Sequence, residues 1–188
     1  SLRVARAVDN QNSNEDERSF ARISTAISKY WITKRAPYLV FEALECHGGP
    51  GYIEESIMPR LYREAPLNSI WEGSGNVMCL DVLRALQRDK NALPALFREL
   101  ASAKGSNKNF DESFSHLQET LQDPLDLEVE ARLLTEKMAC LIQASIFIKS
   151  GEEEKVSAFC NSRLGPRWSG AFGTLPTDTS FEYIMGGL

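Results

Sequence analysis

Glu72 has the surroundings best suited to chemistry in this sequence. It stands between a bulky aromatic residue, Trp71, and a Gly-Ser-Gly run at 73–75 that opens a predicted helix. Shielding by the indole and the backbone would remove water from the carboxylate and raise its pKa toward the range of a general base. Glycine beside the acid lets a planar group lie against the backbone. These residue types indicate a base next to a flat, partly apolar ligand.

The helix predicted after Glu72 adds a place for negative charge. It begins near Asn76, and its unpaired N–H groups point back toward the acid, where they favour a phosphate or another anion. A substrate or cofactor that is part planar ring and part phosphate would suit this combination. The alternative is that Glu72 makes only a favourable contact with the helix dipole.

A second glycine cluster lies upstream, at Gly48, Gly49 and Gly51. Glycines bunched in this way let the backbone pass close to something bulky, either another chain segment or a ligand. Between the two clusters a short helix carries Arg60 and Arg63. Because acidic residues surround both arginines, we expect ion pairs that fix this helix rather than ligand contacts.

The elements that position these residues are predicted to be helices. Apolar residues recur at helical spacing, and the pattern of no segment favours a strand, so the predicted fold class is all-α. Asn14 and Glu17 are expected to form a capping box, and Pro37 a kink or a restart. The expected helices cover about residues 2–8, 14–31, 38–46, 53–65, 76–88, 92–103, 111–121, 127–149 and 152–163, with a docking turn near 181–185.

Composition limits the classes of protein. The chain has 188 residues, of which 43% are hydrophobic, and no apolar run approaches the roughly 20 residues that cross a bilayer. Four widely spaced cysteines and two histidines indicate no metal site and no disulfide framework, so we expect buried, reduced thiols. Without a signal pattern, the expected compartment is the bacterial cytoplasm or an organelle matrix, not the outside of the cell. Because the first residue is not Met, we expect a C-terminal piece of a longer protein.

Three motifs stand in order between residues 38 and 88. They read ECHGGPGY from Glu45, RLYREA from Arg60 and IWEGS from Ile70. Together they resemble the C-terminal helical domain of the acyl-CoA dehydrogenase family of flavoproteins, with its Q-x-x-G-G-x-G-[YF], R-[LM]-x-R-[DE]-A and [IY]-Y-E-G-T motifs. The Trp at 71 and the long helical remainder are similar to the AidB-like branch, the flavoproteins of the adaptive response to DNA alkylation. The resemblance implies an up-and-down helical bundle at 1–90 and a helical extension packed on it at 91–188.

The resemblance also implies roles for the residues around Glu72. Glu72 takes the position of the catalytic base, which removes the α-proton of an acyl-CoA thioester while the β-hydride passes to the flavin. The backbone N–H of Glu72 would help to hold the thioester carbonyl. Trp71 and Gly73 match substrate contacts, and Ser74 and Asn76 match contacts to FAD within the same subunit.

The upstream turn is assigned to a different FAD. Gly48 and Gly49 match the turn that reaches the adenosine diphosphate end of the cofactor in a neighbouring subunit, which implies a homo-oligomer, either a dimer or a homotetramer. Glu45 replaces the glutamine of the family in this turn. A carboxylate is a poorer neighbour for pyrophosphate than an amide, which argues against a direct contact between Glu45 and FAD.

The implied partners are acyl-CoA, the N-terminal and β-domains of the same protein and, in the AidB-like branch, DNA, but no membrane. FAD is expected in the full-length parent, and the chain alone is expected to be colourless and inactive. Arg84 and Arg167 match positions used for DNA, yet the net charge is −5 and acidic residues outnumber basic ones after residue 91. The alternative function is a non-enzymatic assembly or DNA-binding module.

Overall fold

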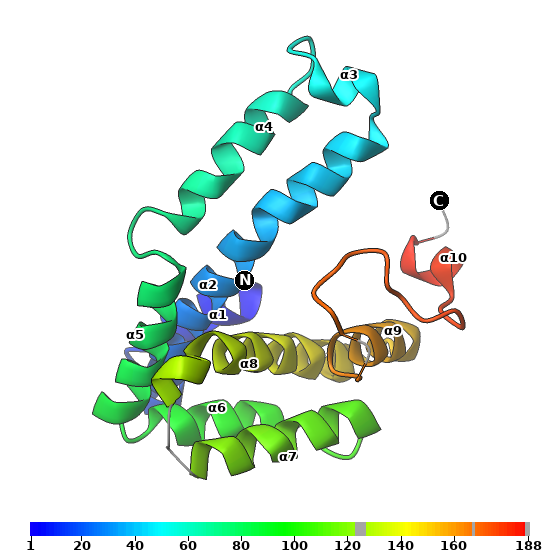
Figure 1. The fold of residues 1–188 in the computed structure, drawn as a ribbon. Helices are drawn as coiled ribbons and strands as arrows, with labels where there is room; N and C mark the ends of the chain where they lie inside the picture. The colour runs from blue at the N-terminus through cyan, green and yellow to red at the C-terminus, as the bar shows by residue number, and fades with distance from the viewer. Residues whose placement is uncertain (123–126, 167, 187–188) are drawn as a thin grey trace. The chain divides into compact units, whose positions relative to one another are not determined.

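The computed structural model describes residues 1–122, 127–166 and 168–186, and within these ranges it contains helices and no strand (Figure 1). This confirms the predicted all-α fold. The helices are α1 (Leu2–Asn10), α2 (Glu15–Cys46), α3 (Gly49–Tyr52), α4 (Met58–Glu64), the 3-10 turn η1 (Ala65–Ser69), α5 (Gly75–Arg88), α6 (Ala92–Ala101), α7 (Lys108–Gln122), α8 (Leu127–Ser150), α9 (Glu153–Arg163) and α10 (Phe181–Ile184).

The chain forms two compact units. The first contains Ser1–Ala92 and Leu127–Thr135, and the second contains Leu93–Asp126 and Glu136–Leu188. The predicted domains, 1–90 and 91–188, stay a prediction. None of the helices in the described ranges is long and apolar enough to cross a bilayer.

The first unit is built around α2, which contacts α1, α4, α5 and η1. The apolar face predicted for the first half of this helix is buried, and α5 contributes Cys79, Val82, Leu83 and Ala85 to the same core. The buried apolar residues of α2 include Phe20, Ile23, Ile27 and Tyr30. Burial of each large side chain contributes roughly 1.5–3 kcal/mol, so this face holds α2 against η1 and α5, the elements on either side of Glu72.

The α2 helix runs through Pro37 without a restart. The predicted second helix at 38–46 is therefore the continuation of the first. Of the two outcomes expected at Pro37, the restart is wrong and the kink stays a prediction. A proline inside a helix removes one hydrogen bond and costs roughly 3 kcal/mol, which the packing of α2 on α1, α3, α4, η1 and α5 can offset. After Pro37 the helix exposes Tyr38, Leu39 and Phe41.

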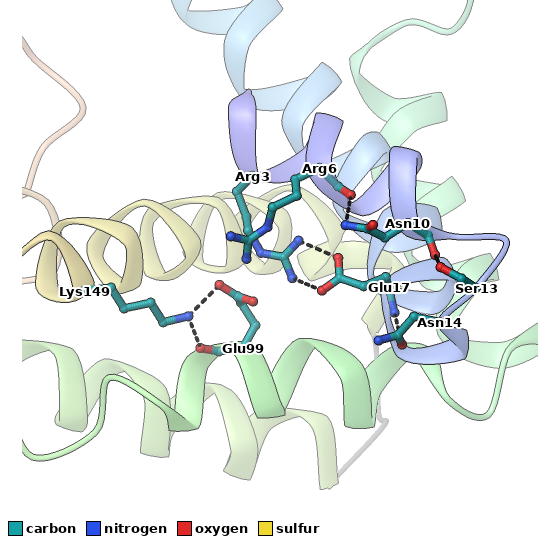
Figure 2. A network of polar contacts seen from close by, with 8 residues as sticks. All are labelled: Arg3, Arg6, Asn10, Ser13, Asn14, Glu17, Glu99 and Lys149. Carbon is teal, nitrogen blue, oxygen red and sulfur yellow. Dashed lines mark hydrogen bonds and ion pairs between the residues drawn. The ribbon is translucent and has the colours of Figure 1, made fainter.

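The start of α2 is capped from one side only. The Asn14 side chain accepts a hydrogen bond from the Glu17 N–H at 3.1 Å, as a capping box predicts. The Glu17 carboxylate does not return to Asn14 but binds the Arg3 guanidinium, with distances of 2.7 and 3.0 Å (Figure 2). Arg3 also lies over the ring of Phe20, at 4.2 Å from its centroid. The reciprocal half of the predicted box is replaced by an ion pair between α1 and α2.

The second unit buries aromatic and aliphatic side chains of α6, α7 and α9 and of the later part of α8. Phe110 and Phe114 pack together on α7, at 6.1 Å between ring centroids. Lys149 donates to the Glu99 carboxylate at 2.7 Å (Figure 2). The Trp168 indole N–H donates to the Glu136 carboxylate at 2.7 Å.

The four cysteines are free thiols, and three of them are buried: Cys79, Cys140 and Cys160. Cys46 is exposed in the last turn of α2, so the prediction of burial is wrong for this residue. Burial raises the pKa of the Cys160 thiol to about 11, and burial also raises the pKa of Cys79.

Candidate functional site

Glu72 lies in the short connection between η1 and α5, and its backbone is left-handed. Its φ is 53°, and every other residue with a positive φ in the described ranges is a glycine. The next residue, Gly73, has a φ of 111°. A left-handed conformation costs a residue with a side chain roughly 1–2 kcal/mol, so the surrounding structure must hold Glu72 there.

Lys29 of α2 supplies contacts that hold this turn. Its ammonium group donates one hydrogen bond to the Trp71 carbonyl oxygen and one to the Gly73 carbonyl oxygen, each at 2.7 Å. The two carbonyls belong to the residues on either side of Glu72. Sequence reasoning missed Lys29, because a lysine more than 40 residues upstream in an amphipathic helix gives no local signal of such a contact.

The carboxylate of Glu72 is exposed, and the Trp71 side chain is 57% exposed. The shielding of the acid by the indole, expected from the sequence, is therefore wrong for this chain. Neither the carboxylate nor the N–H of Glu72 makes a hydrogen bond within the described part of the chain. Both groups are therefore without an internal partner in the described part of the chain.

Glu72 also lines a groove of about 620 Å³ in the first unit. Its other walls come from α1, α2 and α5 and include Lys29, Arg22, Met78 and Asp81. The groove thus combines apolar and charged side chains beside the proposed base. A ligand with an apolar part and polar groups would match this lining.

The helix after Glu72 begins at Gly75, with Ser74 as its N-cap residue. The Ser74 hydroxyl makes no capping hydrogen bond, so the first N–H groups of α5 have no side-chain cap. The Asn76 side-chain oxygen accepts a hydrogen bond from Arg132 at 2.6 Å. A Cβ atom at Gly75 would lie 2.5 Å from Cε of Lys34, the flexible end of a side chain of α2.

The other predicted cofactor residues lie at the turn from α2 to α3. Gly48 has a φ of 61°, and a Cβ atom on Gly48 or Gly49 would meet nothing within 4 Å. Glu45 is exposed in the last turn of α2. Figure 1 places this turn at the far end of the α2 and α4 arm from the start of α5. The structure therefore brings the predicted site residues together in two groups rather than one.

The sequence predicts ion pairs for Arg60 and Arg63 and contacts with DNA for Arg84 and Arg167. Arg60 pairs with Glu64 at 2.9 Å and Arg63 pairs with Glu54 at 2.6 Å, which confirms the predicted ion pairs. Arg167, predicted as a DNA contact, lies outside the described residues.

The other predicted DNA contact, Arg84, shares an acidic partner with a second arginine. It lies 3.5 Å from the Asp81 carboxylate. Asp81 also accepts two hydrogen bonds from Arg22, at 2.8 and 2.9 Å, and these bonds hold the pKa of Asp81 below its ordinary value of 3.8.

Comparisons with known proteins agree with the motifs. Residues 1–87 match the family model of the acyl-CoA dehydrogenase C-terminal domain. AidB of Escherichia coli (strain K12) is 40% identical over 166 residues, which cover 88% of this chain and 30% of that protein. Acyl-CoA dehydrogenase family member 11 of Caenorhabditis elegans is 35% identical over 113 residues, which cover 60% of this chain and 18% of that protein.

A solved structure supports the same relationship. The crystal structure of Caenorhabditis elegans ACDH-11 in complex with C11-CoA matches with a TM-score of 0.75 at 26% identity, covering 86% of this chain and 33% of that chain. The chain thus spans about a third or less of the length of each of these proteins. Residues 1–87 thus match the C-terminal domain of the acyl-CoA dehydrogenase family, and the similarity of the chain to AidB continues well beyond them.

Proposed function

We propose that this chain is the C-terminal part of an FAD-dependent acyl-CoA dehydrogenase in which Glu72 is the catalytic base. The observation that supports this most is the Glu72 turn: a strained acid with no internal partner, clamped on both sides by Lys29 and facing a groove. Backbone strain of this kind clusters at active sites and ligand clamps. The family of residues 1–87 supplies the reaction class.

In the proposed reaction, Glu72 contributes two groups, its carboxylate and its backbone N–H. The Glu72 carboxylate takes the proton from the α-carbon of an acyl-CoA thioester. The Glu72 N–H donates to the thioester carbonyl oxygen, where negative charge develops as the proton leaves, and so lowers the barrier. FAD, when bound, accepts the hydride from the β-carbon.

The residues present fit a flavin nucleotide. The uncapped start of α5, with the free Ser74 hydroxyl, offers donors to hydroxyl or phosphate oxygens, and Asn76 stands beside them. Gly48 and Gly49 present backbone in open space, as a close approach to a cofactor requires. Because these two groups lie apart, one FAD of a homo-oligomer, a dimer or a tetramer, would meet the first group of one subunit and the second group of another. Glu45 stands at the second group, where its charge opposes a direct contact with pyrophosphate.

We also propose a link to the response to DNA alkylation, which the similarity to AidB supports. Binding to DNA is not the function we favour for this chain. Arg84 is already paired with Asp81, and the net charge of −5 opposes a general affinity for phosphates.

The test replaces Glu72 by Gln in the full-length, flavin-loaded protein. Glutamine keeps the shape of the side chain and cannot accept the proton, so we expect the rate at which an acyl-CoA bleaches the flavin to fall about 100- to 10,000-fold. Stopped-flow absorbance measures this rate. Glu55→Gln, at an exposed acid outside the groove, is the matched control and should keep the wild-type rate. An unchanged rate in Glu72→Gln would remove Glu72 from the role of base.

A further inference from the structure

Lys29 and Glu72 line the same groove, yet they do not form an ion pair in the described structure. The ammonium group binds backbone carbonyls instead, those of Trp71 and Gly73. Its charge is therefore used on the backbone of the turn rather than on the carboxylate. Lys29 therefore does not act as the ion-pair partner of Glu72.

The contact with Trp71 has a consequence for the next peptide group. The peptide bond between Trp71 and Glu72 is trans, as no cis bond occurs in the described ranges. In a planar trans peptide the carbonyl and the N–H point in opposite directions. A lysine that fixes the Trp71 carbonyl therefore also fixes the direction of the Glu72 N–H, which points away from the ammonium group.

The second contact holds the other side of the same residue. The Trp71 carbonyl lies in the peptide before Glu72, and the Gly73 carbonyl lies in the peptide after Gly73, so the two hydrogen bonds restrain the segment between them, which includes the left-handed Glu72. Hydrogen bonds from a charged donor are stronger than neutral ones, and they polarise the peptide so that its N–H becomes a better donor. Lys29 itself is anchored, because its neighbour in α2, Tyr30, is buried.

From this geometry we infer that Lys29 is a positioning residue that aims and polarises the Glu72 N–H toward the carbonyl oxygen of a bound thioester. The inference rests on the proposed function and adds to it a second residue, on a different helix. Lys29 does not touch the substrate in this role. It acts through the peptide between Trp71 and Glu72, and it sets the direction from which the carbonyl must approach.

The experiment uses Lys29→Met, which keeps the length of the side chain and removes its charge and its donors. In this chain, the amide NMR resonances of residues 71–74 should move in Lys29→Met. Lys90→Met removes one exposed charge elsewhere in the same unit and should leave them in place. In the full-length, flavin-loaded protein, the limiting rate of flavin bleaching should fall about 10- to 100-fold in Lys29→Met. Binding of a CoA thioether, which lacks the carbonyl, should not change.

The carbonyl stretch of a ¹³C-labelled acyl-CoA separates positioning from mere stability. A hydrogen bond to the carbonyl lowers its infrared frequency, so Lys29→Met should return the band of the bound ligand toward its position in water, and Lys29→Arg should restore part of the shift. If Lys29→Met does not fold, Lys29→Arg replaces it in the test. We expect Lys29→Arg to give a rate of flavin bleaching and a carbonyl frequency between those of the wild type and those expected without the hydrogen bonds.

Wild-type rate and wild-type band in the Lys29 variants, together with loss of the rate in Glu72→Gln, would overturn the role of Lys29 and leave the base in place. A wild-type rate in Glu72→Gln would instead overturn the proposed function. In that case a shifted carbonyl band in Lys29→Met would still support positioning of the N–H.

Discussion

Cys46 and Cys160 represent opposite environments for the same chemical group. Cys46 is exposed at the end of α2, whereas Cys160 is buried and its thiol has a pKa of about 11. Because the thiolate is the reactive form, a rise in pKa from the ordinary value of 9.0 lowers its amount near pH 8 by roughly 100-fold.

We therefore predict that iodoacetamide modifies Cys46 first and leaves Cys160 unmodified until the chain unfolds. Peptide mass spectrometry at increasing times measures the order, and a sample in denaturant is the control in which all four cysteines should react. Equal rates for Cys46 and Cys160 in the folded chain would contradict the burial described above.

At the scale of single residues, the sequence is informative where partners are close along the chain. The pairs of Arg60 with Glu64 and of Arg63 with Glu54 could be predicted from spacing and charge, because few other partners are within reach. The clamp by Lys29 could not be predicted, since it depends on how α2 and α5 pack. The shielding of Glu72 was predicted wrongly, because neighbours in sequence do not have to cover each other: Trp71 turns outward in this chain.

At the scale of elements, the pair of Arg22 and Asp81 joins α2 to α5 beside the groove. Their side chains are 44% and 21% exposed, so after screening by solvent the pair contributes at most about 1 kcal/mol. The hydrogen bonds from Arg22 lower the pKa of Asp81, so the folded state holds the carboxylate charged at a lower pH than the unfolded state does. Its stabilisation is complete above the unfolded value of 3.8 and is lost as the pH falls through the lower, folded value.

Asp81→Asn should therefore lower the free energy of unfolding by up to about 1 kcal/mol at pH 5 to 8. The difference from the wild type should close as the pH falls below about 4, because Asp81 then becomes protonated in the wild type as well. Urea unfolding at several pH values measures both. Glu54→Gln, which breaks an exposed ion pair, should show no measurable effect, and a loss of stability for Asp81→Asn that is independent of pH would contradict the role of the pair.

Most of the longer helices could be predicted from the sequence with small errors in their ends, because they bury apolar residues that recur at helical spacing. The helix expected at 53–65 begins only at Met58 as α4, which places Pro59 in its first turn, and the short helix α3 was not predicted. The exceptions have physical reasons. Pro37 was expected to kink a helix or to start a new one, and α2 continues through it because tertiary packing offsets the local cost. Glu17 was expected to complete a capping box, and a guanidinium from α1 bound its carboxylate instead. Both outcomes depend on contacts between helices, and the spacing of apolar residues along the sequence does not predict such contacts.

At the scale of the whole molecule, the two groups of predicted cofactor residues stand at different ends of one helical arm (Figure 1). Under the proposed function, a single FAD would meet only one of these two groups on each chain. We predict that this 188-residue chain, mixed with FAD and passed over a desalting column, emerges without the flavin absorption band. The full-length protein, treated in the same way, is the control and should emerge yellow. A yellow preparation of the chain alone would show that one group of contacts is sufficient.

The left-handed backbone of Glu72 places stability and activity in opposition at one position. Glycine would adopt this conformation without the steric cost that a side chain carries, so a chain selected for stability alone would gain roughly 1 kcal/mol by losing the acid. A search for more stable variants of this protein would therefore tend to remove its proposed base first. Thermostability and turnover should be scored together whenever residues 71–75 are varied.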